Sequence, residues 1–130
     1  MKAITTLYRP VGQRELDLLV ESDFCKWPPR LPEQPIFYPV TNEQYAIQIA
    51  RDWNVKDQTN GCVGYVTSFD VSSDYLSQFP IEVVGGREHS EYWIPAEQLG
   101  KFNSMIQGKI RVIRKFTADG EVDLDQTNIK

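Results

Sequence analysis

The sequence of 130 residues predicts an α+β fold, with mostly antiparallel short strands in a split or two-sheet core and two or three helices. Apolar residues recur with period two in some segments and at three- and four-residue spacing in others, which indicates both strands and helices. Glycine and proline close many of these runs, so the strands are short. Along the chain the pattern reads strand, helix, stiff loop, strand, helix, strand, short helix, strand, turn, strand, short helix, strand.

The first part of the chain predicts a strand, a helix and a rigid loop. Residues 7–11 form the strand, and apolar residues at helical spacing then continue to about Asp23. Residues 27–35 hold four prolines in nine positions, and proline fixes φ and disfavours helix in the residue before it. We therefore expect an extended loop laid over the body of the domain, with Trp27 and Arg30 as candidates to line a cleft.

The middle of the chain predicts a strand at residues 36–40 and then the clearest helix. Thr41 and Gln44 have the spacing of a capping box, with Thr41 as the N-cap. Five apolar or aromatic residues follow at helical spacing: Tyr45, Ala46, Ile49, Ala50 and Trp53. Residues 62–71 alternate larger apolar side chains with smaller or more polar ones, which predicts a half-buried strand.

The next segments are short. Residues 72–77 resemble a helical turn, residues 81–84 a strand, and Gly85–Gly86 a turn into the following strand. Pro95 suits the first position of a helix, which predicts a helix at residues 96–103.

The last predicted strand places Ile110, Val112 and Phe116 on one face. Residues 119–130 offer little apolar surface to bury, so we expect a polar C-terminal tail that frays. The chain then consists of a single domain at residues 1–118 and this tail.

Composition narrows the class of protein. Hydrophobic residues make up 41% and charged residues 25%, which is typical of a soluble globular domain. No run approaches the roughly 20 apolar residues of a membrane span, and the N-terminus lacks the apolar core of a signal peptide, so we expect a cytoplasmic protein that does not bind membranes. One histidine and two isolated cysteines make a zinc site improbable.

The net charge of −4 argues against a generic nucleic-acid-binding surface. Residues 109–115 are locally basic, but alternating charge on an apolar strand is more simply a solvated outer face or a guarded edge.

The segment at residues 85–99 combines a glycine turn, ionisable side chains and a short apolar run. His89 is the only histidine, and Glu91 follows two residues later. In a strand this spacing directs both side chains to the same face, together with Trp93. We therefore look for chemistry at this face.

Four short stretches carry a resemblance to a known family: Leu7–Tyr8–Arg9–Pro10, Ile36–Phe37–Tyr38 before the helix with Tyr45–Ala46, His89 with Glu91, and Ile94–Pro95. Their order resembles the ADP-ribosyltransferase fold, and it closely resembles a group of small bacterial proteins labelled with ADP-ribosylation. The resemblance covers about residues 6–116.

The resemblance implies NAD as the substrate and assigns residues to its binding. Arg9 matches the strand residue that contacts the NAD ribose or phosphates, and Tyr8 stands beside it in the same motif. The aromatic residue that supports the nicotinamide corresponds to either Phe37 or Tyr38, because a shift of one residue exchanges the two. A planar guanidinium suits a diphosphate because it donates two parallel hydrogen bonds.

The resemblance gives the catalytic role to Glu91, with His89 as a base or as a group that orients the acceptor. The acceptor of ADP-ribose is left open, as is the oligomeric state. The alternative is a non-catalytic binding module that keeps this fold and binds a nucleotide or a protein partner.

Overall fold

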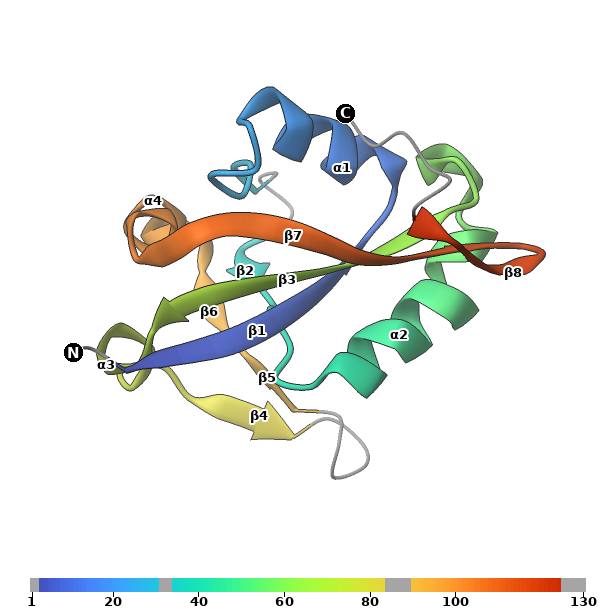
Figure 1. Cartoon of the computed structure of the whole chain (residues 1–130). Helices are drawn as coiled ribbons and strands as arrows, with labels where there is room; N and C mark the ends of the chain where they lie inside the picture. The colour runs from blue at the N-terminus through green and yellow to red at the C-terminus, as the bar shows by residue number, and fades with distance from the viewer. Residues whose placement is uncertain (1–2, 31–33, 84–89, 125–130) are drawn as a thin grey trace.

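The computed structural model describes residues 3–30, 34–83 and 90–124, and within them the fold is α+β with mostly antiparallel strands, as predicted (Figure 1). The main sheet has the order β1-β3-β7-β8, and the further pairs are β2-β6 and β4-β5. The strands are β1 (Ile4–Val11), β2 (Ile36–Phe37), β3 (Gly64–Ser72), β4 (Ile81–Val83), β5 (Ser90–Tyr92), β6 (Ile94–Pro95), β7 (Ile106–Thr117) and β8 (Gly120–Val122).

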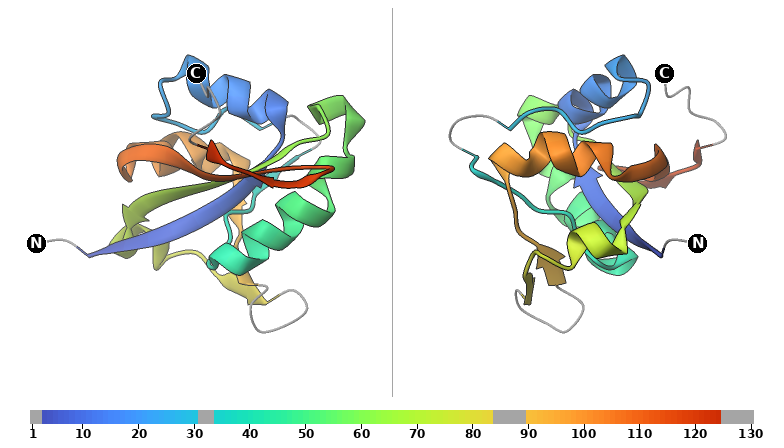
Figure 2. Two further views of the ribbon diagram at one scale, coloured as in Figure 1. Left: turned by 45° about the vertical axis from the view of Figure 1, so that its right-hand side comes forward. Right: turned by 90° about the vertical axis from the view of Figure 1, so that its left-hand side faces the viewer.

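Helices cover both faces of the main sheet. The helices are α1 (Gln13–Glu21), α2 (Glu43–Asp52), α3 (Ser73–Leu76) and α4 (Leu99–Ser104), with 3₁₀ turns η1 (Asn54–Lys56), η2 (Gln58–Asn60) and η3 (Ala96–Gln98). Figures 1 and 2 show α1 and α2 on opposite sides of the sheet. One core cluster joins α1 and α4 to the sheet, and a smaller one joins α2 to its other face. We call them the α1-side core and the α2-side core.

The central strand β3 is buried on both faces, so the prediction of a half-buried strand was wrong. Phe69 belongs to the α1-side core and Val66 to the α2-side core. The polar Thr67 is buried too, and its hydroxyl donates to the carbonyl oxygen of Arg9 at 2.8 Å. Because small and polar residues stand at alternate positions of β3, the sequence pattern did not indicate that its second face is buried.

Replacing Gly64 with alanine is expected to lower the free energy of unfolding by about 1–3 kcal/mol, because it overpacks the contact between β3 and α2. An added Cβ would lie 2.6 Å from the carbonyl oxygen of Ala50 and 2.9 Å from its Cα, which are backbone atoms that cannot turn away. Urea denaturation measures the loss. The matched control is Gly100→Ala in α4, where an added Cβ meets nothing within 4 Å, and an equal loss there would contradict the packing argument.

The predicted helix after residue 41 is present as α2, but its cap and its buried face differ from the prediction. The N-cap is Asn42, whose side-chain oxygen accepts from the backbone N–H of Tyr45 at 2.9 Å. Thr41 instead hydrogen-bonds the hydroxyl of Ser90, so the predicted capping box is wrong by one residue. The buried residues of α2 are Ala46, Ile47 and Ala50, while Trp53 is 70% exposed.

The strand predicted at residues 36–40 is shorter in the structure. β2 ends at Phe37, and Val40 then forms isolated bridges to Tyr8 of β1 and to Glu91 of β5. The short segment around Val40 therefore connects the hairpin of β4 and β5 to the edge of the main sheet.

The last strand is kinked, and Phe116 faces the α2 side, opposite to the prediction. The pairing between β3 and β7 shifts register twice, and Gly108 has a φ of +78°, which glycine adopts without strain. Ile110 consequently packs in the α1-side core, whereas Phe116 packs in the α2-side core. The frayed-tail prediction was wrong for β8, which pairs with the end of β7.

Several predicted elements agree with the structure. β1 and α1 are confirmed, and so is the helical turn α3. The proline loop lacks regular structure in its described part, and Trp27 at its start is 1% exposed. Pro95 ends β6, and the predicted helix after it divides into η3 and α4. The predicted turn at residues 85–86 lies outside the described residues.

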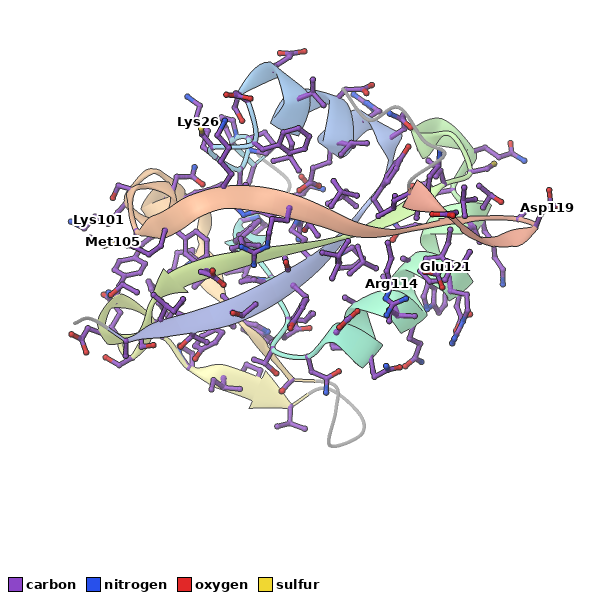
Figure 3. All side chains as sticks on the ribbon, viewed as in Figure 1. Lys26, Lys101, Met105, Arg114, Asp119 and Glu121 are labelled. Carbon is purple, nitrogen blue, oxygen red and sulfur yellow. The ribbon has the colours of Figure 1, made fainter. Side chains whose placement is uncertain are left out.

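Three basic side chains of β7, those of Lys109, Arg111 and Arg114, pair with acidic neighbours. Arg114 donates to Glu43 of α2 at 2.8 Å and to Glu121 of β8 at 2.9 Å, and Figure 3 shows Arg114 and Glu121 beside each other. Arg111 pairs with Asp70. Most of the local positive charge of this strand is thus matched within the fold, and Lys115 lies over the ring of Tyr65.

Candidate functional site

The pairing between β1 and the segment around Val40 ends before Pro10. Tyr8 exchanges two backbone hydrogen bonds with Val40, at 2.9 and 2.8 Å. Strand pairing uses alternate residues along one edge, and the next residue on this edge is Pro10, which has no N–H to donate. The pairing stops there, and a cavity of about 280 Å³ lies next to it.

This cavity, which we call the edge cavity, gathers residues from four separate segments of the chain. Its lining residues are Arg9, Pro10, Tyr38, Val40, Ile49 and Glu91. Arg9 belongs to β1, Tyr38 follows β2, and Glu91 belongs to β5. The structure therefore brings together three of the residues that the sequence predicted for one site.

Two hydrogen bonds orient the carboxylate of Glu91. The indole N–H of Trp93 donates to Oε2 at 2.8 Å, and the hydroxyl of Tyr45 donates to Oε1 at 3.4 Å. The contact with Trp93 agrees with the prediction that the side chains of Glu91 and Trp93 lie on one face of the strand. Each oxygen of the carboxylate accepts one of these bonds and keeps capacity to accept another.

The pKa of the Tyr45 hydroxyl lies above its usual range, first because of burial and then because of the negative charge of Glu91 and the hydrogen bond to it. We predict that Glu91→Gln lowers the pKa of Tyr45 but leaves it above its usual value, since the burial persists. Ultraviolet titration of the tyrosines, with Tyr45→Phe to assign the signal, measures the change. An unaltered Tyr45 titration in Glu91→Gln would contradict this contact.

Arg9 is held rigidly before any ligand arrives. Its guanidinium donates to both oxygens of Glu15, at 2.7 and 3.1 Å, and the arginine side chain is only 12% exposed. The same group lies over the rings of Phe37 and Trp27, at 4.7 and 5.6 Å from their centroids. These contacts fix its position and match its charge.

The structure separates the two aromatic candidates after β2. Phe37 is 1% exposed and supports Arg9 from within the core, so its ring is covered. Tyr38 is 38% exposed and lines the edge cavity, with its ring 5.9 Å from that of Trp93 in a T-shaped arrangement. Tyr38 is therefore the candidate to contact a ligand.

Of the two remaining predicted site residues, Tyr8 is not among the described residues that line the edge cavity. Tyr8 packs against the α2-side core. His89 lies outside the described residues.

A second cavity of about 280 Å³ is also lined by Arg9 and lies between α1 and the proline loop, and we call it the arginine cavity. Its lining residues are Arg9, Arg14, Glu15, Leu18, Pro28, Pro29, Arg30 and Gln34. Neither Glu15 nor Arg14 had a predicted site role. One sequence feature could have indicated a role for these two residues: both lie in the first turn of a helix that directly follows the strand with Arg9.

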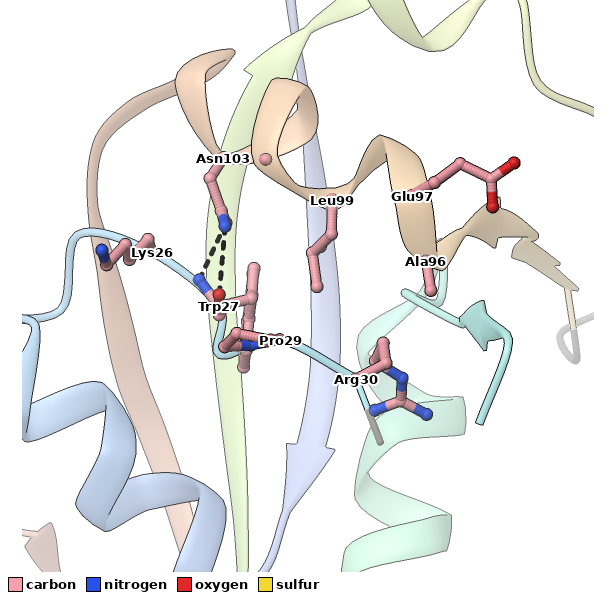
Figure 4. Close-up of a pocket in the computed structure, with 9 residues that line it drawn as sticks. Lys26, Trp27, Pro29, Arg30, Ala96, Glu97, Leu99 and Asn103 are labelled. Carbon is pink, nitrogen blue, oxygen red and sulfur yellow. Dashed lines mark hydrogen bonds between the residues drawn. The ribbon is translucent and has the colours of Figure 1, made fainter. Parts of the chain in front are cut away.

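A third and larger cavity, of about 600 Å³, lies between the proline loop and α4 (Figure 4). The side chain of Asn103 bonds the backbone N–H and carbonyl oxygen of Trp27, at 2.8 and 3.0 Å, and thereby fixes the start of the loop. Arg30 lines both this cavity and the arginine cavity.

The described parts of the chain, residues 3–30, 34–83 and 90–124, contain no group of three or more histidine, cysteine, aspartate or glutamate side chains arranged to hold a metal ion. Among the same residues no helix has the length and apolar character needed to cross a membrane. Cys25 and Cys62 are free and exposed.

Comparisons of the chain with protein-family models, with curated proteins and with solved structures give no match. Function is therefore inferred from the residues and their geometry.

Proposed function

We propose that the chain is an ADP-ribosyltransferase-like protein that binds NAD at the edge cavity and transfers ADP-ribose to an acceptor. The observation that carries the proposal is the convergence of Arg9, Tyr38 and Glu91 on one cavity from three distant segments. The resemblance in the sequence assigns an NAD contact to Arg9 and the catalytic role to Glu91, and it leaves the aromatic contact to Phe37 or Tyr38.

Glu91 supplies the central chemistry in this proposal. Cleavage of the bond between nicotinamide and ribose develops positive oxocarbenium character on the sugar. A carboxylate that accepts hydrogen bonds from the ribose hydroxyls stabilises this charge, and one that is oriented beforehand does so without reorganisation. Tyr45 and Trp93 provide that orientation.

Tyr38 and Arg9 have binding roles in this proposal. The exposed ring of Tyr38 offers a flat apolar surface for the nicotinamide, and its T-shaped contact with Trp93 holds it in place. Arg9, which also lines the cavity, contributes positive charge.

A non-catalytic module that binds a nucleotide or a protein partner is the second candidate. One observation favours it: Glu15 already accepts two hydrogen bonds from Arg9, so the charge of this arginine is matched within the protein. A ligand diphosphate would have to share Arg9 with Glu15.

Incubation with NAD labelled in the nicotinamide ring tests the proposal. We expect the labelled ring to be released as free nicotinamide when protein is present, and Tyr38→Ala to weaken the binding of NAD. Saturable binding of NAD without release of nicotinamide would favour the non-catalytic module. Absence of both binding and release would overturn the proposal.

A further inference from the structure

The arginine cavity concentrates positive charge in a chain with a net charge of −4. Three of its lining residues are Arg9, Arg14 and Arg30, and the one acidic lining residue among those described is Glu15. Glu15 accepts both of its hydrogen bonds from Arg9. Arg14 and Arg30 form no ion pair with any described residue, so among the described lining residues three positive charges stand against one negative charge.

Placing the charged guanidinium of Arg30 in the arginine cavity costs free energy. Its guanidinium lies 5.9 Å from the centroid of Phe37, the ring that also supports Arg9, so one aromatic ring holds two cations. Burial lowers the pKa of Arg30, and repulsion from Arg9 lowers it further. Its Nε is buried and has no hydrogen-bond acceptor among the described residues. A bound anion would offset both the repulsion and the loss of solvation.

The walls of the cavity favour a compact anion with a fixed position. Pro28 and Pro29 give the loop side a restricted backbone, and α1 gives the other side a regular one. The volume of about 280 Å³ lies just below the usual range of small-molecule sites, roughly 300–1,000 Å³. A phosphate or diphosphate group fits within a cavity of this size.

We infer that the arginine cavity binds a phosphate-type anion, either free or as the diphosphate of a small molecule, with Arg30 and Arg14 as its contacts. Planar guanidinium groups recognise phosphate oxygens through paired, charge-assisted hydrogen bonds. This inference goes beyond the proposed function, because it requires neither turnover of NAD nor the edge cavity.

Isothermal titration of the full chain with inorganic pyrophosphate at low ionic strength tests the inference. We expect saturable binding that weakens as sodium chloride is added, because counterions screen the contact. Arg30→Gln should weaken binding about tenfold or more, since loss of a charge-assisted hydrogen bond costs about 1.5–3 kcal/mol. Arg14→Gln should weaken binding by a smaller factor because Arg14 is exposed. Arg111→Gln on β7 is the matched control and should leave the affinity unchanged.

Titrations with pyrophosphate and with ADP distinguish a site for a free anion from a site for the diphosphate of a nucleotide. Equal affinity for pyrophosphate and ADP would identify a site for the free anion, whereas tighter binding of ADP would identify the diphosphate of a nucleotide. If Arg30→Gln does not fold, chemical-shift changes in the wild-type protein on adding pyrophosphate give the position of the site directly. No binding of either ligand, equal weakening by Arg111→Gln, or shifts centred away from Arg14 and Arg30 would overturn the inference. Because Glu91→Gln retains this site, its pyrophosphate binding should persist even where NAD is not turned over.

Discussion

Glu91→Gln is expected to reduce the release of nicotinamide from NAD about 100-fold or more, while changing the affinity for NAD only slightly. The amide keeps the size of the side chain and retains an oxygen that accepts from Trp93 or Tyr45, but it removes the negative charge. In the proposed reaction, that charge stabilises the positive sugar in the transition state and contributes little to binding the ground state. Loss of a single electrostatic group of this kind costs about 10²–10³ in rate.

Glu82→Gln is the matched control for this substitution. Glu82 pairs directly with Glu91 across the β4–β5 hairpin, and it is not among the described residues that line the edge cavity. The same loss of charge at the neighbouring position should therefore leave turnover within about twofold. Rates that fall equally in both variants would mean that the hairpin as a whole, and not the carboxylate in the cavity, supports the reaction.

Trp27→Ala is expected to lower the free energy of unfolding by about 3–5 kcal/mol, the usual cost of deleting a large buried aromatic side chain. The indole is 1% exposed and packs against the rings of Phe37 and Phe69, at 5.5 and 5.1 Å between centroids. It also supports the guanidinium of Arg9. The substitution therefore loosens the proline loop and the candidate site together.

Trp53→Ala provides the comparison for that loss of stability. Trp53 is 70% exposed at the end of α2, and its removal should change the free energy of unfolding by no more than about 0.5 kcal/mol. Urea denaturation of both variants measures the difference. Similar losses at the two positions would show that burial in the α1-side core does not determine the stability contributed by Trp27.

The sequence predicted elements well where a local period governs them, and less well where tertiary packing does. The apolar spacing before and after residue 41 located α1 and α2. It misplaced the cap of α2, because the choice between Thr41 and Asn42 depends on Ser90, which engages Thr41 from a distant strand. It also placed Trp53 on the buried face, which only the position of the sheet could correct.

The strands show the same division. Period-two alternation located β3 but suggested one buried face, because a central strand can bury small polar residues such as Ser68 when a partner satisfies them. The alternation also placed Phe116 on the same face of β7 as Ile110, because a change of register has no clear signature in a run of alternating residues.

The candidate site was predictable in part. The resemblance selected Arg9, Glu91 and either Phe37 or Tyr38, but no local pattern shows that β1, the segment after β2 and β5 meet at one cavity. The ion pair of Arg9 with Glu15 depends on the angle between a strand and the helix after it. Sequence spacing does not fix that angle.

The central claim is that NAD occupies the edge cavity in contact with Arg9, Tyr38 and Glu91. The most direct measurement is a titration of the isotope-labelled protein with NAD, followed through the backbone amide resonances. The account predicts saturable shifts that are largest at these three residues and small at Leu99 and Gly100, which line the cavity beside α4. No saturable shift at the three residues, or shifts centred on Leu99 and Gly100, would contradict it.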